Sequence, residues 1–542
     1  MLFCVGLPVL GQQVTDRKKQ IADSASIRFQ RNTHLVVLDS SSKIVSWTTP
    51  QSQAYDRFLR KRWQFIKTMA PASPGPGPRS NYPQYYFYCA FKPHDGILEA
   101  DTWMNDIGEK IPNWFESARL YYAYTGDTGV MKIMGDFLDY TLEHGTSPEN
   151  FSWPFFPYTT ANAGDMEYRG FTSGGRFKLH EIQVDHAGDI GLTYYRMYQF
   201  SGKKKYLDAA LHVANTLASK VRVGSATQSP WPYRVVMDNG QVIAEYGANW
   251  SGAYLLLYNL IKDGVGNVTA YAQACEKVRA FIRDYPMKTG FWTDGHTDTD
   301  VKSNTYKSNL SASNMTLLML DNPDFNPDWK QDVPKLIRWT EDNFVFRGDS
   351  SEPGLMWGAH IVGEQDGYLF KMDYQTARYG AECARWFSIS GDTSYKEKAY
   401  RSLNWVTYCS DSNGMGVECP LSVGISNWWS DLYGEGPRMF YQAMAGVPEW
   451  APAAENHILY SKDVLKEVFY RPKQIEYTAT GKTGTEFIKL NFQPNRVLVN
   501  GKTISKRTDS SQPGYSLTKL GNGDYFLKIY RVVAGKVFIT GT

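Results

Sequence analysis

The sequence contains 542 residues, which is too long for one ordinary hydrophobic core and predicts two domains. Its 58 basic and 55 acidic residues leave a net charge of only +3, which indicates neither a nucleic-acid-binding surface nor a basic tail. Aromatic residues make up 15% of the chain, and several lie beside Gly, Pro, Asn and Asp. Flat aromatic faces in polar loops suit the binding of sugar rings.

The N-terminus reads MLFCVGLPVLGQQ, an apolar stretch followed at once by polar residues. It is too short to span a bilayer, and we interpret residues 1–12 as a signal remnant, with a buried strand as the alternative. No other apolar run has the length of a membrane span. We therefore expect a secreted or periplasmic protein that does not cross a membrane.

Residues 26–90 are predicted to form an N-terminal helical and linker segment. The stretch Tyr55–Met69 (YDRFLRKRWQFIKTM) has the pattern of a helix. A linker rich in helix breakers, APASPGPGPRSNYP, follows at Ala70–Pro83.

Five later segments repeat one pattern: an aromatic-rich helix, a turn and a second amphipathic helix. They begin at Tyr121, Tyr194, Tyr254, Leu317 and Ala384. Turn glycines follow the first helix in four of them, Asp321-Asn322 takes the place of the glycine in the other, and a sixth helix spans Arg438–Gly446. Such a regular period predicts stacked helical hairpins, and six hairpins can close into a ring. We predict a mainly α fold with an (α/α)6 barrel, a six-hairpin toroid, over residues 91–455.

From Lys466 the hydrophobic period changes from helical to alternating. Six segments read as strands, and Asn500-Gly501 and Gly521-Asn522-Gly523 have the composition of hairpin turns. Residues 464–542 are therefore predicted to form a small C-terminal antiparallel β-sandwich domain.

In a ring of hairpins the inner helices run parallel, so their N-termini open on one face. These N-termini carry unpaired N–H groups and positive dipole ends that suit anionic groups. The segments just before the inner helices contain Trp, His, Asn and carboxylates, whereas helix capping alone would supply Asn, Asp and Ser. The candidate substrate-binding residues are His180, Asp189, Trp250, Asn249, Tyr246, Trp357, His360, Tyr374, Trp428, Trp429 and Arg438.

The segment HEIQVDHAGDIGLTYYRMY places Asp185 and Asp189 four residues apart, on one face at the start of a helix. One interpretation is an N-cap and a first-turn partner of the helix dipole. The other is a carboxylic acid with a raised pKa that protonates a glycosidic oxygen. Glycoside cleavage uses a pair of carboxylates on either side of the sugar. Asp106, just before the preceding inner helix, is the candidate partner of Asp185 in such a pair.

The stretch Val184–Ala210 (VDHAGDIGLTYYRMYQFSGKKKYLDAA) resembles the region around the catalytic aspartate of unsaturated glucuronyl and rhamnogalacturonyl hydrolases, six-hairpin barrel enzymes related to β-glucuronidases. In those enzymes an Asp opens an inner helix that ends in a similar turn. The resemblance implies that Asp185 is the general acid/base and that Asp106 matches their second aspartate. It covers the helical region and not the β tail.

Four function hypotheses remain open at this stage. The first is a glycoside hydrolase acting on a uronic-acid-containing oligo- or polysaccharide, with Arg438 and His180 meeting the carboxylate and tryptophans stacking on the rings. The second is a polysaccharide lyase with Tyr246, Tyr374 or His360 as base. The third is a non-catalytic glycan-binding protein, and the fourth is an epimerase or isomerase that uses His180 with His360.

The sequence contains no phosphate-binding loop, dinucleotide fingerprint or metal-spaced Cys/His cluster. We therefore expect no cofactor and no catalytic metal. The expected partner is the saccharide substrate.

Overall fold

The computed structural model describes residues 34–48, 50–94, 97–100, 103–294, 306–346, 356–366, 371–417, 434–508 and 512–541. The interpretation of residues 1–12 as a signal remnant, and the candidates Trp428 and Trp429, lie outside these ranges.

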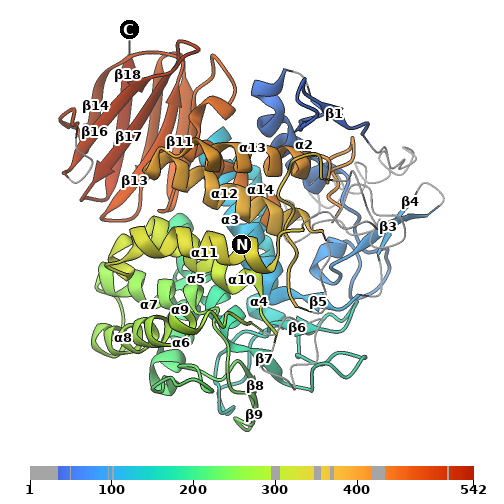
Figure 1. Ribbon diagram of the computed structural model, residues 1–542. Helices are drawn as coiled ribbons and strands as arrows, with labels where there is room; N and C mark the ends of the chain where they lie inside the picture. Colours follow the sequence, from blue (N-terminus) through green and yellow to red (C-terminus); the bar gives the residue numbers. More distant parts are fainter. Residues whose placement is uncertain are drawn as a thin grey trace, which may run out of the picture.

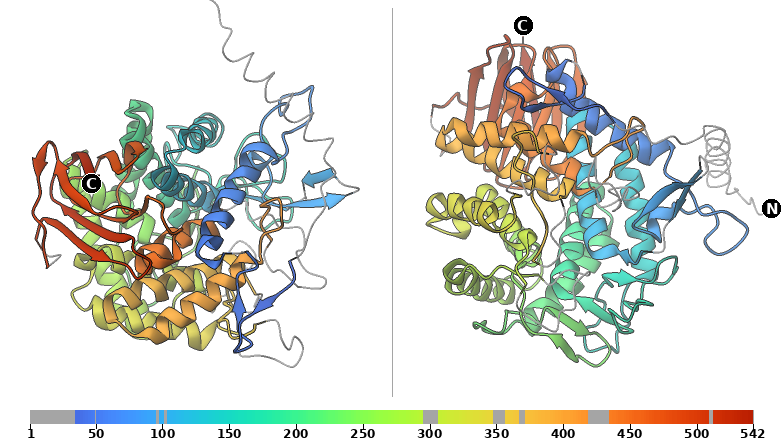
Figure 2. Two further views of the ribbon diagram at one scale, coloured as in Figure 1. Left: turned by 90° about the horizontal axis from the view of Figure 1, so that it is seen from above. Right: turned by 45° about the vertical axis from the view of Figure 1, so that its right-hand side comes forward.

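Six inner helices form a closed ring (Figures 1 and 2). They are α3 (Ile107–Thr125), α5 (Val184–Ser201), α7 (Ser251–Asp263), α10 (Asn309–Asp321), α12 (Asp373–Ser390) and α14 (Glu435–Gly446). Each packs against the next along the chain, and α14 returns to pack against α3. The predicted (α/α)6 barrel is confirmed.

Outer helices follow five of the inner helices and run back along them. They are α4 (Thr128–His144), α6 (Lys204–Lys220), α8 (Val268–Asp284), α11 (Trp329–Asn343) and α13 (Thr393–Thr407), with the short α9 (Pro286–Thr289) after α8. The turn glycines Gly126, Gly202, Gly264 and Gly391 end their inner helices in the left-handed conformation, with φ between 71° and 79°. Glycine adopts this conformation without the strain that a Cβ would cause.

The N-terminal helix α2 (Ala54–Thr68) fills the sixth outer position, behind α14. Its Tyr55 and Phe58 rings lie 5.0 and 4.7 Å from the ring of Phe440 on α14. Lys67 forms a 2.7 Å ion pair with Asp127, the residue that caps α4. The segment predicted as a separate N-terminal helix and linker is therefore part of the barrel and completes its sixth hairpin.

Short strands lie in the segments between the helices, and two pairs of them fix where α3 and α5 begin. The strands are β1 (Val37–Leu38), β2 (Ile44–Val45), β3 (Phe91–His94), β4 (Ile97–Ala100), β5 (Asn105–Asp106), β6 (Thr160–Ala161), β7 (Glu181–Gln183), β8 (Arg234–Val236) and β9 (Val242–Ala244). β5 pairs with β6 directly before α3, and β7 pairs with β8 directly before α5. The first residues of α3 and α5 are thus anchored by strand pairing.

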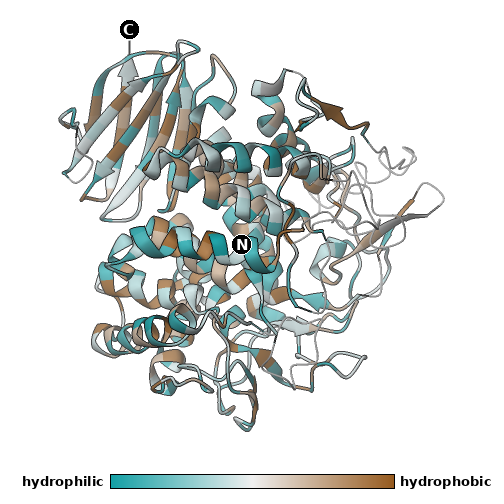
Figure 3. Ribbon diagram, in the orientation of Figure 1, coloured by the Kyte–Doolittle hydropathy of each residue, from teal (hydrophilic) through white to brown (hydrophobic). Residues whose placement is uncertain are grey.

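The C-terminal region is a sandwich of two antiparallel sheets. Its strands are β10 (His457–Ser461), β11 (Leu465–Arg471), β12 (Gln474–Ala479), β13 (Gly484–Leu490), β14 (Pro494–Val499), β15 (Lys502–Thr503), β16 (Gly514–Lys519), β17 (Tyr525–Arg531) and β18 (Gly535–Gly541). One sheet has the order β10-β13-β17-β16, and the other has the order β11-β12-β18-β14-β15. Figure 3 shows the hydrophobic and hydrophilic residues alternating along these strands.

The sandwich packs on the C-terminal ends of α3 and α14. His457 of β10 stacks on Tyr124 at a ring distance of 3.9 Å, and its Nδ1–H donates to the Tyr124 carbonyl. The Tyr470 hydroxyl donates to the carbonyl of Ala123. These bonds satisfy carbonyls that the end of a helix leaves without intrahelical partners. None of the helices within the described ranges is long and apolar enough to cross a membrane.

The packing of α2 predicts a large effect of substituting Trp63, which is fully buried and lies 5.2 and 5.6 Å from the rings of Trp114 and Tyr121 on α3. Trp63→Ala should lower the free energy of unfolding by about 3–5 kcal/mol, because it leaves a large cavity. Urea denaturation followed by circular dichroism measures this change. Gln64→Ala, at an exposed position of the same helix, should change stability by less than about 0.5 kcal/mol. If both variants lose the same free energy of unfolding, α2 does not close the barrel.

Candidate active site

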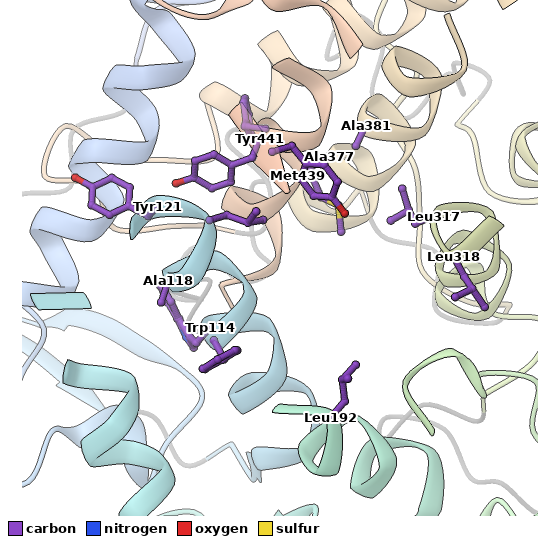
Figure 4. Packing of buried hydrophobic residues seen from close by; sticks show 14 of the residues in the cluster. Trp114, Ala118, Tyr121, Leu192, Leu317, Leu318, Ala377, Ala381, Met439 and Tyr441 are labelled. Carbon is purple, nitrogen blue, oxygen red and sulfur yellow. The ribbon is translucent and has the colours of Figure 1, made fainter. Parts of the chain in front are cut away.

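A cavity of about 160 Å³ lies inside the ring of inner helices. All six inner helices and loops of the sandwich contribute to its wall. Leu192, Leu317 and Leu318 form an apolar part of the wall, and Figure 4 shows them on α5 and α10. Most other lining side chains are charged or carry amides, and Tyr460 is the single aromatic residue among the described residues that line the cavity. We call this space the axial cavity.

The helix α5 carries two acids near this cavity. Asp189 lines the cavity, and Asp185 lies one turn nearer the N-terminus of α5, 1% exposed. Burial raises the pKa of Asp189 to about 7. Burial, followed by the charges of Asp189 and Asp294, raises the pKa of Asp185 well above its usual value. Because two nearby carboxyl groups in a dry site cannot both ionise easily, the pair retains a proton near neutral pH.

The position of Asp189 depends on a glycine of the neighbouring helix. A Cβ at Gly252 of α7 would lie 1.6 Å from Oδ1 of Asp189. A Cβ at Gly188 of α5 would lie 2.8 Å from the Cβ of Ala253. The two glycines allow α5 and α7 to approach closely and leave room for the carboxyl group.

Two arginines face the acid pair from the other side of the ring. Arg378 on α12 pairs with Glu435 and donates a hydrogen bond to Asn314, and Arg438 on α14 lies 3.7 Å from Glu435. Burial, followed by the charge of Arg438, lowers the pKa of Arg378 to about 9. The Nε atoms of both arginines are buried without a hydrogen-bond partner. The region thus offers two unused N–H donors on two guanidinium groups, which suits binding of an anion.

Glu109 and Asn314 complete this part of the site. Glu109 was not among the residues predicted from the sequence. Glu109 on α3 lines the cavity, and its charge raises the pKa of Asp189. Asn314 on α10 donates a 3.0 Å hydrogen bond to the predicted residue Asn249. A sequence signal for Glu109 existed, since the first turns of four inner helices carry an acid: Glu109, Asp185, Asp373 and Glu435.

An ion cluster lies further along the axis. Glu116 on α3 forms ion pairs with Arg119 and with Arg196 of α5. Although burial opposes this shift, the two arginines lower the pKa of Glu116 to about 2. Arg119 also donates a 2.8 Å hydrogen bond to the carbonyl of Ser461 in the sandwich. This cluster joins two inner helices to the second domain and keeps its carboxylate ionised.

Of the predicted site residues, the structure brings Asp189, Asn249 and Arg438 together around the axial cavity. Neither predicted catalytic residue lines the cavity: Asp185 is buried one turn before Asp189, and Asp106 is at the N-cap of α3. Asp106 is 1% exposed, its backbone N–H donates to Sγ of Cys89, and its charge acts on buried Lys110.

The predicted aromatic residues within the described ranges pack in the protein interior. Trp250 is fully buried, its indole N–H donates to the Gly247 carbonyl, and it packs on Trp231, which leaves no free face for a sugar ring. Tyr246 packs between Phe281 and Phe291. Tyr374 and Trp357 likewise lie away from the cavity: Tyr374 donates to Glu364, and the Trp357 carbonyl accepts from Ile44.

The two predicted histidines also lie away from the cavity and from each other. His180, with φ of 65°, shares a 2.7 Å hydrogen bond with Tyr158 before α5. His360 shares a 2.8 Å hydrogen bond with Tyr379, and the Ser402 hydroxyl donates to its carbonyl. His186 is the histidine that lines the cavity among the described residues. No group of three His, Cys, Asp or Glu in the described part of the chain could hold a metal ion.

The barrel and its charged axis define an (α/α)6-barrel protein, and solved structures share this fold. A cellobiose 2-epimerase from Spirochaeta thermophila is 10% identical, with a TM-score of 0.51 over 73% of this chain and 97% of that chain. An unsaturated glucuronyl hydrolase specific for heparin is also 10% identical, with a TM-score of 0.44 over 73% of this chain and 96% of that one. A family 88 glycosyl hydrolase from Bacteroides vulgatus has a TM-score of 0.43 at 10% identity, over 74% of this chain and 99% of that chain.

No family model and no curated protein matches the sequence. Of these three structures, the cellobiose 2-epimerase has a TM-score above 0.5, and at 10% identity its likeness supports the fold alone.

The raised pKa of Asp189 predicts a pH-dependent effect of its removal. Between about pH 4 and pH 7 the folded protein keeps this proton, whereas the unfolded chain, with a pKa near 3.8, has lost it. The group therefore makes the free energy of unfolding fall as the pH rises through this window. Asp189→Asn removes this group. As the pH rises from about 4 to about 7, the free energy of unfolding of the variant should therefore increase relative to that of the wild type. Above about pH 7 the difference between the two should stay constant.

Urea denaturation at a series of pH values measures this difference. Asp136→Asn, at an exposed position on α4, controls for the removal of one carboxylate. If the difference in the free energy of unfolding between Asp189→Asn and the wild type does not change with pH, the pKa of Asp189 is not raised.

Proposed function

We propose that the protein is a glycoside hydrolase that cleaves a uronic-acid-containing, glucuronyl-type oligo- or polysaccharide. The observation that supports this most directly is the protonated acid pair Asp185 and Asp189 opposite the two arginines Arg378 and Arg438. A carboxylic acid that keeps its proton near pH 7 is a suitable general acid. A pair of guanidinium groups is a suitable partner for a sugar carboxylate.

In the proposed reaction, Asp185 gives its proton to the leaving glycosidic oxygen, or to the vinyl-ether carbon if the uronide is unsaturated. Water then attacks, and its proton passes to the carboxylate that has just formed. Glu109, from the neighbouring helix α3, positions the water or the sugar hydroxyls, in place of Asp106 as the second carboxylate. Asp189 acts by keeping the pKa of Asp185 high.

The alternatives receive less support from the described residues. The candidate lyase bases Tyr246, Tyr374 and His360 do not line the cavity, and neither does Asp185. The hydroxyl of Tyr374 is bonded to Glu364, and His360 is bonded to Tyr379. Burial also raises the pKa of Tyr246, which leaves less of it as the phenolate that would act as the base. The fold of a cellobiose 2-epimerase supports an enzyme that acts on a saccharide. A histidine pair for epimerisation would need His180 and His360 together, and they lie apart from the cavity.

The first test is the turnover of an unsaturated glucuronyl disaccharide and of a glucuronate polymer. A hydrolase of unsaturated uronides removes the ultraviolet absorbance of the double bond, a lyase creates it from the polymer, and an ordinary hydrolase releases reducing ends without changing it. Asp185→Asn should reduce kcat/KM by about 100-fold or more, because it removes the general acid. Asp208→Asn, on the exposed side of α6, should retain activity. Full activity of Asp185→Asn would refute the proposed role.

The pH dependence of kcat/KM separates the roles of the two acids. In Asp189→Asn the charge that raises the pKa of Asp185 is gone, so the basic limb of the pH profile should move to lower pH. An unchanged profile would show that Asp189 does not influence the proton donor.

Recognition of the carboxylate is tested at Arg438. Arg438→Gln should raise KM for a glucuronide by about 10- to 100-fold, because a hydrogen-bonded charge pair is lost, with a smaller effect on the matching glucoside. Arg283→Gln, on the exposed end of α8, is the matched control. Equal losses on the glucuronide and the glucoside would argue against binding of the carboxylate by Arg438.

A further inference from the structure

A second hollow lies between the barrel and the sandwich. This groove has a volume of about 500 Å³. Tyr258 and Lys262 at the end of α7 form one wall, and the segment that ends α10 adjoins them. The facing wall is the sheet β13-β17-β16, including Phe487, Lys528 and Tyr530. The groove borders the axial cavity, because Lys262, Asp321 and Lys462 line both.

The strand register explains why aromatic and basic side chains share this wall. Phe487 pairs with Lys528, and Thr485 pairs with Tyr530, across β13 and β17. Since alternate residues of a strand share one face, these side chains point away from the sandwich core, which contains Ile488, Leu527 and Ile529. Packing of the two sheets therefore does not account for a phenyl ring, a phenol and an ammonium group on the outer face.

Four cations, Lys262, Lys462, Arg507 and Lys528, line the groove. Burial, followed by the charge of Arg385, lowers the pKa of Lys528. No ion pair between Lys528 and a carboxylate is found among the described residues, and its Nζ lies 5.6 and 5.3 Å from the ring centres of Phe487 and Phe526. Burial, followed by the charge of Lys462, likewise lowers the pKa of Lys262.

Only two acids, Asp321 and Asp324, are found among the described residues that line the groove with these four cations. Asp321 forms a 2.9 Å ion pair with Arg385 and accepts from the hydroxyl of Tyr460. Asp324 accepts a hydrogen bond from the hydroxyl of Tyr258. The groove therefore keeps a positive charge excess that an anionic ligand would balance.

The apolar surface of the groove favours a sugar over an aliphatic peptide. Among the described residues it comes from Phe487, Pro323 and the tyrosines Tyr258, Tyr515 and Tyr530, with no Leu, Ile or Val. Aromatic faces suit the C–H faces of pyranose rings, and ammonium groups suit carboxylates.

We propose that this groove is a second saccharide-binding site, built by both domains, that holds an anionic segment of a uronate-containing glycan. The ligand class is taken from the proposed function, whereas the site and its residues are independent of the acid pair. Lys528 and Lys262 bind the carboxylates, and Phe487 and Tyr530 contact the sugar rings.

The test is calorimetric binding of a glucuronic acid hexasaccharide to the full-length Asp185→Asn variant, which cannot consume it. Two sites are expected. Addition of Lys528→Gln, or of Tyr530→Ala, should weaken one of them about tenfold or more, whereas Lys528→Arg should bind within about threefold of the parent. Lys519→Gln, at an exposed position of β16 outside the groove, is the matched control.

Several outcomes would overturn the proposal. One is that Lys528→Gln and Tyr530→Ala both bind the hexasaccharide as Lys519→Gln does. A second is that neutral cellohexaose binds the groove as tightly as the hexasaccharide. A third is that a polyglutamate peptide displaces the hexasaccharide, which would indicate a site for acidic peptides. If circular dichroism shows that Tyr530→Ala does not fold, the affinities of Lys528→Gln and Lys528→Arg for the hexasaccharide still test whether the charge of Lys528 binds it.

Adding Arg438→Gln to the Asp185→Asn variant separates this proposal from the proposed function. It should remove binding to the axial cavity and leave the groove site intact. Groove binding without turnover by the wild-type protein would refute only the hydrolase assignment. If the wild-type protein turns over the substrate but shows a single binding site that Lys528→Gln does not affect, only the proposal of saccharide binding in the groove is refuted.

Discussion

The structure depends on one constraint: the inner helices of the barrel are buried over most of their length. Each is enclosed by outer helices or the sandwich on one side and by the axis on the other, so its polar side chains must find partners within the ring. Most do, as in the pairing of Glu116 with Arg119 and Arg196. Within the described part of the chain no Lys or Arg forms an ion pair with Asp185 or Asp189. His186 lies 4.0 Å from Asp185, and burial raises the pKa of both acids, so that they keep a proton. Desolvation thus provides the acid that the proposed reaction needs.

The fold could be predicted because its signals are local. A turn glycine such as Gly126 or Gly391 can end an inner helix in the left-handed conformation whatever the helix packs against, and the alternating pattern of the C-terminal strands needs no partner to be recognised. The closing of the ring by α2 could not be predicted in this way. It depends on contacts between Tyr55 and Phe440, which lie far apart in the sequence, and no local pattern encodes them.

The site was predicted only in part, for a related reason. Asp185 and Asp189 stand one turn apart, so helix geometry alone places them together. Arg378 and Glu109 belong to different hairpins, and only the closed ring brings their charges to Asp189. Trp250 shows the opposite case. A tryptophan before an inner helix can stack on a sugar or fill the space between hairpins, and its bond to Gly247 and contact with Trp231 place it in the core.

The sandwich contributes more than a cover for the barrel end. It supplies partners to the last carbonyls of α3 through His457 and Tyr470, and it receives a hydrogen bond from Arg119 of the ion cluster. Because these bonds are numerous, polar and buried, the two domains should move as one body. The groove and the acid pair are then held at a fixed separation. A polymer that fills the groove would present its next segment to the barrel in one orientation, which would make the second domain part of how the enzyme selects its substrate.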